Sequence, residues 1–322
     1  MSLVNHILPE ERRVKLKQKI NRGEKVKCIE VHSGLSALIC SQSQRVIPGN
    51  RPERFDALWI SSLTGSASKG LPDMEIYLLE RRLELIEEVC QVTKLPIIVD
   101  GDTGGDPTGF EYFCTKLEAL GVSAVVIEDK KHPKRNSLSE DSAHVLEDPI
   151  LFAGKIQRAK KALQSDAFMI FARIESLIAG ESIEDALSRA NIYLKYGADG
   201  IMIHSKSNHG KDITEFLSRF QASKNNIPII CVPTTYNFIY DKELFRLGAS
   251  IVIHANHTLR AAHKAIEKIC EVILENDRSY EADELCTPVK EIFSMVGYDA
   301  ALVRERSLYK PLGKNKYSIK TA

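Results

Sequence analysis

The chain has 322 residues, of which 43% are hydrophobic, so it can bury one large core or two small ones. Its 44 basic and 43 acidic residues nearly cancel, which gives no general attraction to nucleic acid or to a membrane surface. The N-terminus lacks the apolar region of a signal peptide, no stretch approaches the roughly 18 apolar residues of a membrane span, and the cysteines have no metal-type spacing. We therefore expect a soluble, cytoplasmic protein with reduced thiols that binds neither nucleic acid nor membranes.

Short apolar runs rich in β-branched residues recur along the chain and predict eight buried strands. They are 25–34, 56–65, 95–104, 123–130, 168–176, 199–207, 227–235 and 250–257. Segments with helical periodicity lie between or after them, among them 74–93, 109–121, 182–197 and 257–277. Gly121 and Gly197 stand where a glycine is expected at the C-terminal end of a helix.

The alternation of strands and helices favours a parallel β/α architecture, and eight strands is the number in a closed (β/α)8 barrel of the TIM type. A doubly wound open sheet is the alternative. We predict that residues 1–285 form the catalytic barrel with an N-terminal helical extension. Residues 286–322 are expected to add C-terminal helices and a polar tail to the same domain, with 313–322 frayed.

Polar residues follow most of the predicted strands, at the end of a barrel where active sites are found. They are Glu30, His32, Trp59, Ser61, Ser62, Asp100, Asp102, Glu128, Asp129, Arg173, Glu175, His204, Thr234 and Asn256. The carboxylates of Asp100, Asp102 and Glu128 come from adjacent strands and suit Mg²⁺ or Mn²⁺. Arg173 and His204 could bind an anion, because a guanidinium matches the geometry of a carboxylate or phosphoryl group.

Each of these residues also has a simpler interpretation. A strand-end aspartate is more often a helix cap or turn former than a ligand, His204 could be a core histidine, and Trp59 could fill the barrel mouth. The basic stretch at 130–138 could be a solvated turn. Asp100 and Asp102 are harder to dismiss, because side chains two apart on a strand share one face and like charges held together are costly without a cation.

Several segments carry a resemblance to known proteins: VDGDTGG, VVIEDKKHPKRNS, FARIESLIAG, DGIMIHSKS, CVPTTY and IHANHTLRAA. Over residues 25 to 295 the chain resembles the isocitrate lyase and phosphoenolpyruvate mutase superfamily, and within it the phosphoenolpyruvate mutases. The most specific motif is EDK, five residues, then NS, formed here by Glu128, Asp129, Lys130, Asn136 and Ser137.

The resemblance implies a role for each matching position. The metal ligands it implies are Asp100, in direct contact with Mg²⁺, and Asp102 and Glu128, largely through water. The catalytic residues it implies are Asp73, Lys134, Asn136, Arg173 and His204. The substrate-binding residues it implies are Trp59, Ser61, Ser62, Leu63, Ser137 and Leu138. Residues 134–138 would belong to a gating loop.

The implied reaction moves the phosphoryl group of phosphoenolpyruvate from the enol oxygen to C3, through a Mg²⁺-stabilised pyruvate enolate. The product, phosphonopyruvate, contains the carbon-phosphorus bond that begins phosphonate biosynthesis. Phosphoryl transfer depends on positioning and electrostatics and needs a lid that excludes water. The resemblance also implies a homodimer or homotetramer with C-terminal helices swapped between subunits, and a phosphonopyruvate decarboxylase or similar enzyme that consumes the product.

Three alternatives remain: a phosphonopyruvate hydrolase, a 2-methylisocitrate- or oxaloacetate-type lyase of the same superfamily, and a non-catalytic metabolite-binding barrel. The lyases typically carry Cys-Gly-His in the gating loop, and the hydrolases typically carry threonine where this chain has Asn136. The mutase hypothesis is therefore favoured. Ser62 stands where mutases commonly have glycine, and residues 105–109 replace an aromatic-Gly-Asn segment. Both departures bear on the choice of substrate.

Overall fold

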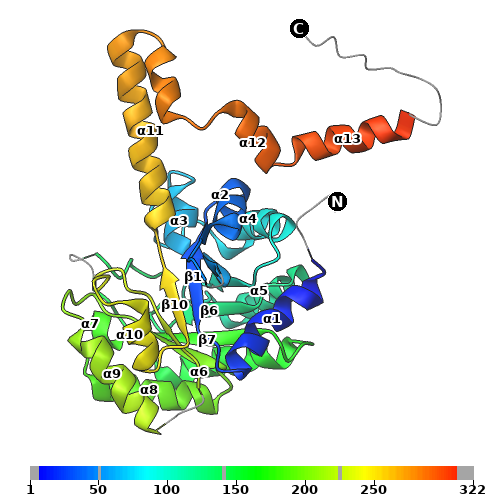
Figure 1. Cartoon of the computed structure of the whole chain (residues 1–322). Coiled ribbons are helices and arrows are strands. Elements are labelled where there is room, and N and C mark those ends of the chain that lie inside the picture. The colour runs from blue at the N-terminus through cyan, green and yellow to red at the C-terminus, as the bar shows by residue number, and fades with distance from the viewer. Residues whose placement is uncertain (1–6, 50–51, 140–142, 224–226, 310–322) are drawn as a thin grey trace. The chain divides into compact units, whose positions relative to one another are not determined.

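The computed structural model describes residues 7–49, 52–139, 143–223 and 227–309 (Figure 1). They divide into two compact units, one ending at Leu259 and one beginning at Arg260. Over these ranges no helix is long and apolar enough to cross a membrane. The segment 313–322, which we predicted to be frayed, lies outside the described residues.

The predicted barrel is confirmed. Its parallel strands follow one another around a closed sheet in the order β1-β10-β9-β8-β7-β6-β5-β4. They are β1 (Val26–Glu30), β4 (Ala57–Ile60), β5 (Ile97–Asp100), β6 (Ala124–Glu128), β7 (Met169–Ile174), β8 (Gly200–Ile203), β9 (Ile229–Cys231) and β10 (Ile251–His254). Val26 of β1 lies opposite Ile251 of β10, and Cys28 lies opposite Ala57 of β4. Because each of these strands pairs with a neighbour on both sides, the sheet has no edge strand and the open sheet is excluded.

Helices surround the strands of the first unit (Figure 1). They are α1 (Pro9–Asn21), α2 (Gly34–Gln42), α3 (Ser62–Ala67), α4 (Leu79–Val92), α5 (Pro107–Leu120), α6 (Pro149–Ala162), α7 (Ser176–Ala179), α8 (Ile183–Lys195), α9 (Lys211–Ser223) and α10 (Asp241–Arg246). Gly121 follows α5 in the left-handed conformation with φ of 81°, as its predicted place after a helix requires.

One predicted helix start is wrong. The periodic pattern begins at residue 74, but α4 begins at Leu79. Glu75 has a φ of 59°, which a right-handed helix cannot accommodate. Residues 73–78 therefore form a connection instead, and this connection carries the side chains of Asp73 and Glu75.

The second unit is helical. It contains most of α11 (His257–Asn276), a 3-10 turn (Tyr280–Leu285), α12 (Val289–Met295) and α13 (Tyr298–Tyr309). The rings of Phe293 and Tyr298 lie 5.0 Å apart between their centroids and join α12 to α13. C-terminal helices are thus confirmed. Their exchange between subunits stays a prediction, because a single chain is described.

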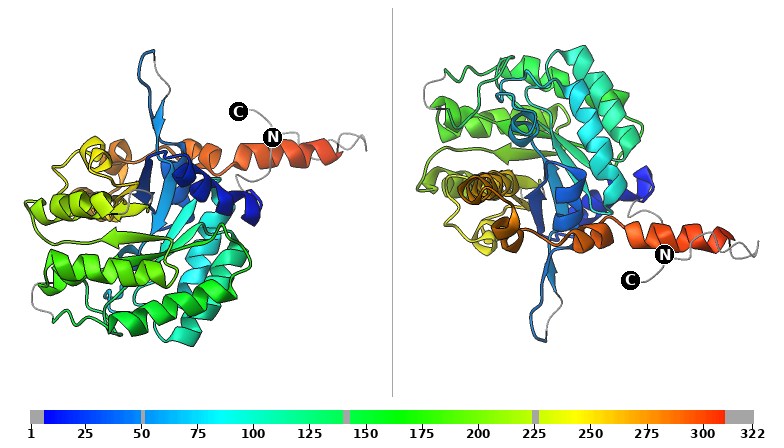
Figure 2. Two further views of the ribbon diagram at one scale, coloured as in Figure 1. Left: turned by 90° about the horizontal axis from the view of Figure 1, so that it is seen from below. Right: turned by 90° about the horizontal axis from the view of Figure 1, so that it is seen from above.

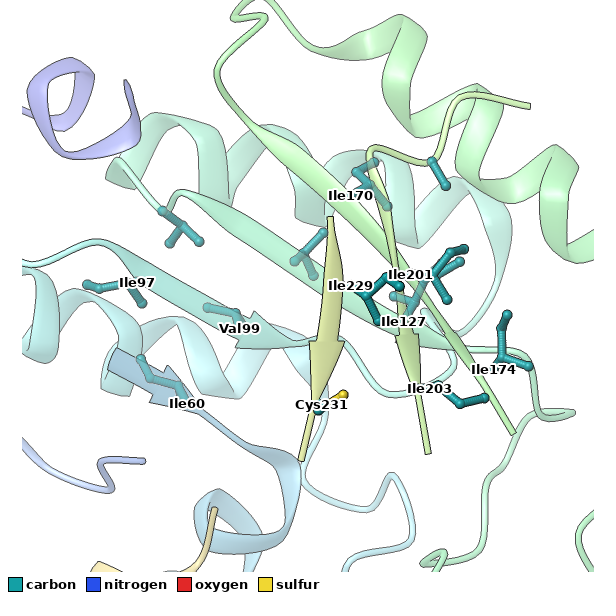
Figure 3. Packing of buried hydrophobic residues seen from close by; sticks show 14 of the residues in the cluster. Ile60, Ile97, Val99, Ile127, Ile170, Ile174, Ile201, Ile203, Ile229 and Cys231 are labelled. Carbon is teal, nitrogen blue, oxygen red and sulfur yellow. The ribbon is translucent and has the colours of Figure 1, made fainter. Parts of the chain in front are cut away.

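Side chains alternate between two apolar layers along each strand, as the two-residue period of a strand requires. Ile97 and Val99 point outward into the layer between strands and helices (Figure 3). Ile98 points into the barrel, in a second cluster that also contains Trp59. Leu16 of α1 packs into this inner cluster and is fully buried. By the same alternation, Asp100 follows Ile98 on the inward side and reaches the barrel mouth.

A short antiparallel ribbon was not predicted. It joins β2 (Gln44–Arg45) to β3 (Glu53–Arg54) between α2 and β4, and all four of its strand residues are exposed. The ribbon extends away from the barrel in both views of Figure 2. Its strands are too short and too polar to produce a clear alternating pattern.

Gly200 lies where the inner layer is tightly packed. A Cβ at this position would lie 2.5 Å from Pro228 O and 2.7 Å from Cδ1 of Phe171. We expect Gly200→Ala to lower the free energy of unfolding by about 2 kcal/mol or more through overpacking. The matched change Gly154→Ala, inside α6 with no atom within 4 Å of its Cβ, should raise it by about 0.5–1 kcal/mol. Urea unfolding measures both, and equal effects would contradict the packing argument.

Candidate functional site

A cavity of about 70 Å³ lies at the carboxyl ends of the strands. This space suits a few waters or a small organic acid better than a nucleotide. Its lining consists of Glu30, Trp59, Ser61, Ser62, Leu63, Asp73, Asp100, Lys134, Asn136, Ser137, Leu138, Arg173, Met202, His204, Val232, Thr234, Ala255 and Asn256. Every residue to which the resemblance implies a role is in this lining except Asp102 and Glu128, which are buried without lining it. Of the other polar residues predicted at this end of the barrel, His32, Asp129 and Glu175 do not line the cavity.

Asp100 is held by hydrogen bonds from two neighbouring segments. Its Oδ2 accepts from the hydroxyl of Ser62 at 2.9 Å, and its Oδ1 accepts from the backbone N–H of Asp102 at 3.0 Å. Burial by itself raises the pKa of Asp100, but the cations of Lys134, Arg173 and Arg82 outweigh it and hold the pKa below its ordinary value. Asp100 is therefore an oriented, ionised carboxylate.

The acidic residues of the mouth fit a hard cation. Both carboxylate oxygens of Glu128 and one oxygen each of Asp73 and Asp102 are buried without a hydrogen bond of good geometry. They are contacted by the cations of Lys130, Lys134 and Arg173, at 2.7–3.7 Å. Buried carboxylate oxygens held only by ion pairs can also contact a metal ion, and carboxylates suit Mg²⁺. Within the described ranges, however, no three His, Cys, Asp or Glu side chains are arranged to hold a metal. The arrangement thus fits an ion that has few direct protein ligands and keeps its waters.

The side of the cavity that contains Arg173 and His204 is organised by Glu175. Its carboxylate lies 2.5 Å from Nε of Arg173, 2.8 Å from Nδ1 of His204 and 2.7 Å from Nζ of Lys130. Burial and the charge of Arg173 lower the pKa of His204, so the imidazole is neutral near pH 7. Arg173, which lines the cavity, is thus a permanent cation on this side, and Glu175 fixes its orientation. The sequence placed Glu175 in the polar ring without assigning it a role.

Residues 130–139, which we call the 130–139 loop, lie against this cavity instead of forming a solvated turn. Nζ of Lys134 lies 2.7 Å from Oδ1 of Asp102 and is almost completely buried. Nδ2 of Asn136 donates to Oδ2 of Asp73 at 2.6 Å, and the hydroxyl of Ser137 donates to Glu175 at 2.5 Å. Leu138 lines the cavity but remains 41% exposed.

Burial by itself lowers the pKa of Lys134, but Glu128, Asp100 and Asp73 outweigh it and raise the pKa. Lys134 is therefore a cation at neutral pH. It provides one of the positive charges that allow the carboxylates of the mouth to stay ionised while buried.

Two supporting residues were missed. Glu75 accepts hydrogen bonds from the backbone N–H of Lys134 at 2.7 Å and from the hydroxyl of Thr103 at 2.6 Å. The buried Arg82 of α4 forms an ion pair with Asp102 and donates to the carbonyl of Asp100 at 2.7 Å. Both lie in the segment predicted to be one continuous helix, where charged residues are ordinarily solvent-facing. Nothing in their spacing distinguished them.

Asp129, which the sequence places in the polar ring, has contacts that are structural. The residue is buried and accepts a hydrogen bond from the hydroxyl of Tyr193 at 2.6 Å and from the backbone N–H of Glu175 at 2.9 Å. It does not line the cavity. Its contacts join the start of the 130–139 loop to α8 and to the end of β7.

Glu30 is the last residue of β1, and its side chain lines the cavity. Its carboxyl group accepts hydrogen bonds from the hydroxyls of Ser61 and Thr64 and from the backbone N–H of Asn256. Burial raises its pKa to about 7, although these hydrogen bonds act in the opposite direction. Glu30 thus connects the segments after β1, β4 and β10, and its proton is bound more tightly in the folded protein than in the unfolded chain.

The raised pKa of Glu30 predicts a pH dependence of stability. The contribution of Glu30 to the free energy of unfolding is fully present below the ordinary pKa of glutamic acid and is lost as the pH rises through about 7. Between pH 5 and pH 8 we expect this group to lower the free energy of unfolding of the wild-type protein by about 2–3 kcal/mol. In Glu30→Gln this decline should be absent. Urea unfolding across this range measures it. The exposed control Glu267→Gln should keep the wild-type slope, and an unchanged slope in Glu30→Gln would contradict the assignment.

The family described as "Phosphoenolpyruvate phosphomutase" matches residues 16–274. The phosphoenolpyruvate phosphomutase of Tetrahymena pyriformis is 33% identical over 299 residues, which cover 92% of this chain and 95% of the relative.

Two solved structures are similar. That of phosphoenolpyruvate phosphomutase from Streptomyces platensis subsp. rosaceus has a TM-score of 0.84 and 33% identity, covering 92% of this chain and 99% of that one. That of a phosphonopyruvate hydrolase complex with oxalate and Mg²⁺ has a TM-score of 0.80 and 29% identity, covering 94% and 98%. The chain therefore belongs to the phosphoenolpyruvate phosphomutase family, a family of enzymes in the phosphoenolpyruvate mutase and isocitrate lyase superfamily.

Proposed function

We propose that this enzyme interconverts phosphoenolpyruvate and phosphonopyruvate with Mg²⁺ (or Mn²⁺) as cofactor. The observation that carries the proposal is the contact of Asn136 with Asp73 at 2.6 Å, made by a loop whose buried residues line the cavity. A phosphoryl group in transfer must be kept from water, and a loop in this position excludes it.

The cavity offers separate positions for the two anionic groups of the substrate. Arg173 and the neutral His204 lie on one side and would bind the phosphoryl oxygens. Trp59, Ser61, Ser62 and Leu63 come from β4 and the start of α3 and would bind the pyruvate moiety. Asp100 would hold Mg²⁺ directly, with Asp102 and Glu128 contributing through water. When bound, Mg²⁺ supplies Lewis-acid stabilisation for negative charge that develops on the pyruvate oxygens.

The side chains of the site would contribute to catalysis mainly by positioning the substrate. Asn136 holds Asp73, and together they would keep the phosphoryl group in line between the enol oxygen and C3. Lys134 balances the acidic residues, and Ser137 and Leu138 close the loop over the substrate. Because the transition state is loose, little covalent assistance is required of the protein.

Phosphonopyruvate hydrolysis is the second candidate, because a phosphonopyruvate hydrolase is among the similar structures. Asn136 favours the mutase, since hydrolases typically carry threonine there. The lyase alternative is weakened by the absence of cysteine from residues 115 to 230.

We also propose a homodimer or homotetramer. Leu274, Val289 and Leu308 of the second unit are each more than half exposed, and apolar side chains of this kind are typical of an oligomer contact. A reaction that consumes phosphonopyruvate, such as its decarboxylation, is the functional partner proposed.

The first test supplies phosphonopyruvate and Mg²⁺ to the purified enzyme and follows phosphorus NMR. We expect phosphoenolpyruvate to appear, and we expect EDTA to stop the reaction until Mg²⁺ is restored. Inorganic phosphate as the sole product would instead establish the hydrolase.

The second test removes single groups from the site. Asp100→Asn and Asn136→Ala should each lower kcat/KM at least about 100-fold by removing the carboxylate charge or the contact with Asp73. Thermal unfolding should remain close to wild type. Asp106→Asn is the matched control, because Asp106 caps α5 outside the cavity and asparagine keeps the cap. Full activity in Asp100→Asn would refute the metal assignment.

A further inference from the structure

Ser62 is the first residue of α3, and its hydroxyl lies between Asp100, at the end of β5, and Lys134 of the 130–139 loop. The side chain is almost fully buried and lines the cavity. Its Oγ lies 2.9 Å from Oδ2 of Asp100 and 2.6 Å from Nζ of Lys134. The hydroxyl therefore contacts one residue of the rigid barrel and one residue of the loop.

The direction of these two hydrogen bonds follows from the chemistry of the partners. An ammonium group only donates and an ionised carboxylate only accepts. Lys134 must donate to the Ser62 oxygen, and the Ser62 hydroxyl must donate to Asp100. The three groups form a relay from loop to strand, in which each bond strengthens the other.

The Ser62 oxygen also completes the surroundings of the Lys134 ammonium. Three oxygens lie around Nζ: Oδ1 of Asp102 at 2.7 Å, Oδ1 of Asp73 at 3.3 Å, and Oγ of Ser62 at 2.6 Å. Of these three, Oγ of Ser62 is the one that accepts a hydrogen bond of good geometry. A residue without a hydroxyl would leave one ammonium hydrogen unpaired where Lys134 is only 3% exposed. An unpaired buried donor favours a conformation in which water can reach it.

We propose that the Ser62 hydroxyl is a positioning group that links Asp100 to Lys134 and thereby holds the 130–139 loop closed over the cavity. The inference rests on the proposed function only in its consequence, which is that a closed loop protects the migrating phosphoryl group from water. Ser62 acts through Lys134 and Asp100 and is not itself a reacting group.

Trypsin tests the link without any substrate. The loop contains Lys131, Lys134 and Arg135, of which Lys131 and Arg135 are exposed and Lys134 is buried. Cleavage after any of them requires the loop backbone to leave its folded position and extend in the active site of the protease. We expect Ser62→Ala to increase the rate of cleavage within 131–135 about tenfold at unchanged thermal stability. Mass spectrometry identifies the cleaved bonds. A wild-type cleavage rate in Ser62→Ala would overturn the proposal.

Two further variants separate the hydroxyl from side-chain volume and from the helix. Ser62→Gly should resemble Ser62→Ala; slower cleavage than wild type in Ser62→Gly would show instead that Ser62 crowds the loop, and would overturn the link. Ser68→Ala removes a hydroxyl from the end of the same helix, where it bonds only to the carbonyl of Gly65 at 2.9 Å. It should leave cleavage unchanged.

A double-mutant cycle tests whether the effect passes through Lys134. Ser62→Ala should add little to the cleavage rate at Lys131 and Arg135 once Lys134→Met has removed the ammonium. Additive effects would overturn the link. With phosphonopyruvate, Ser62→Ala should raise the ratio of phosphate to phosphoenolpyruvate. Failure of the wild type to form phosphoenolpyruvate would refute the proposed function alone, because the cleavage rates do not depend on turnover.

Discussion

The site depends on one constraint: carboxylates can be buried as ions only if cations and hydrogen-bond donors are buried with them. Asp100, Asp102 and Glu175 are all almost completely buried at the mouth of the barrel. Arg82 of α4, Arg173 of β7 and Lys134 of the 130–139 loop supply the compensating charges. Because one of these cations lies on a loop, the charge balance of the site and the position of the loop are coupled.

The barrel provides the fixed half of this arrangement. Its strands are buried on both sides, and the alternation of side chains sends one residue of each pair into the inner cluster and the other toward the helices. Glu30, Asp100 and Arg173 therefore reach the same mouth although they are far apart in the sequence. Loops of the barrel add the other residues of the cavity, which is the usual division between scaffold and function in this fold.

Membership of the family restricts the possible reactions but does not distinguish phosphomutase from phosphonopyruvate hydrolase activity. Phosphomutase and phosphonopyruvate hydrolase structures both resemble this chain over nearly its whole length. Both reactions can use the same cation, enolate and phosphoryl contacts, and they differ in whether water reaches the phosphoryl group. We propose that closure is controlled by residues that include Asn136, Lys134 and Ser62, and we therefore expect the distinction between the two activities to depend on them.

The sequence by itself determined the eight strands, their alternation with helices, and the set of polar residues at the mouth, because these follow from local periodicity and from the register of strand ends. Tertiary structure decided the rest. It replaced the first residues of the predicted helix by a connection, in which Glu75 accepts a hydrogen bond from the backbone of Lys134. It also buried Arg82 against Asp102. For the basic stretch of residues 130–138 the sequence left a solvated turn and a gating loop as alternatives, and the structure places this stretch against the cavity. Local pattern could not show this, because whether a charged side chain is buried depends on partners distant in the sequence.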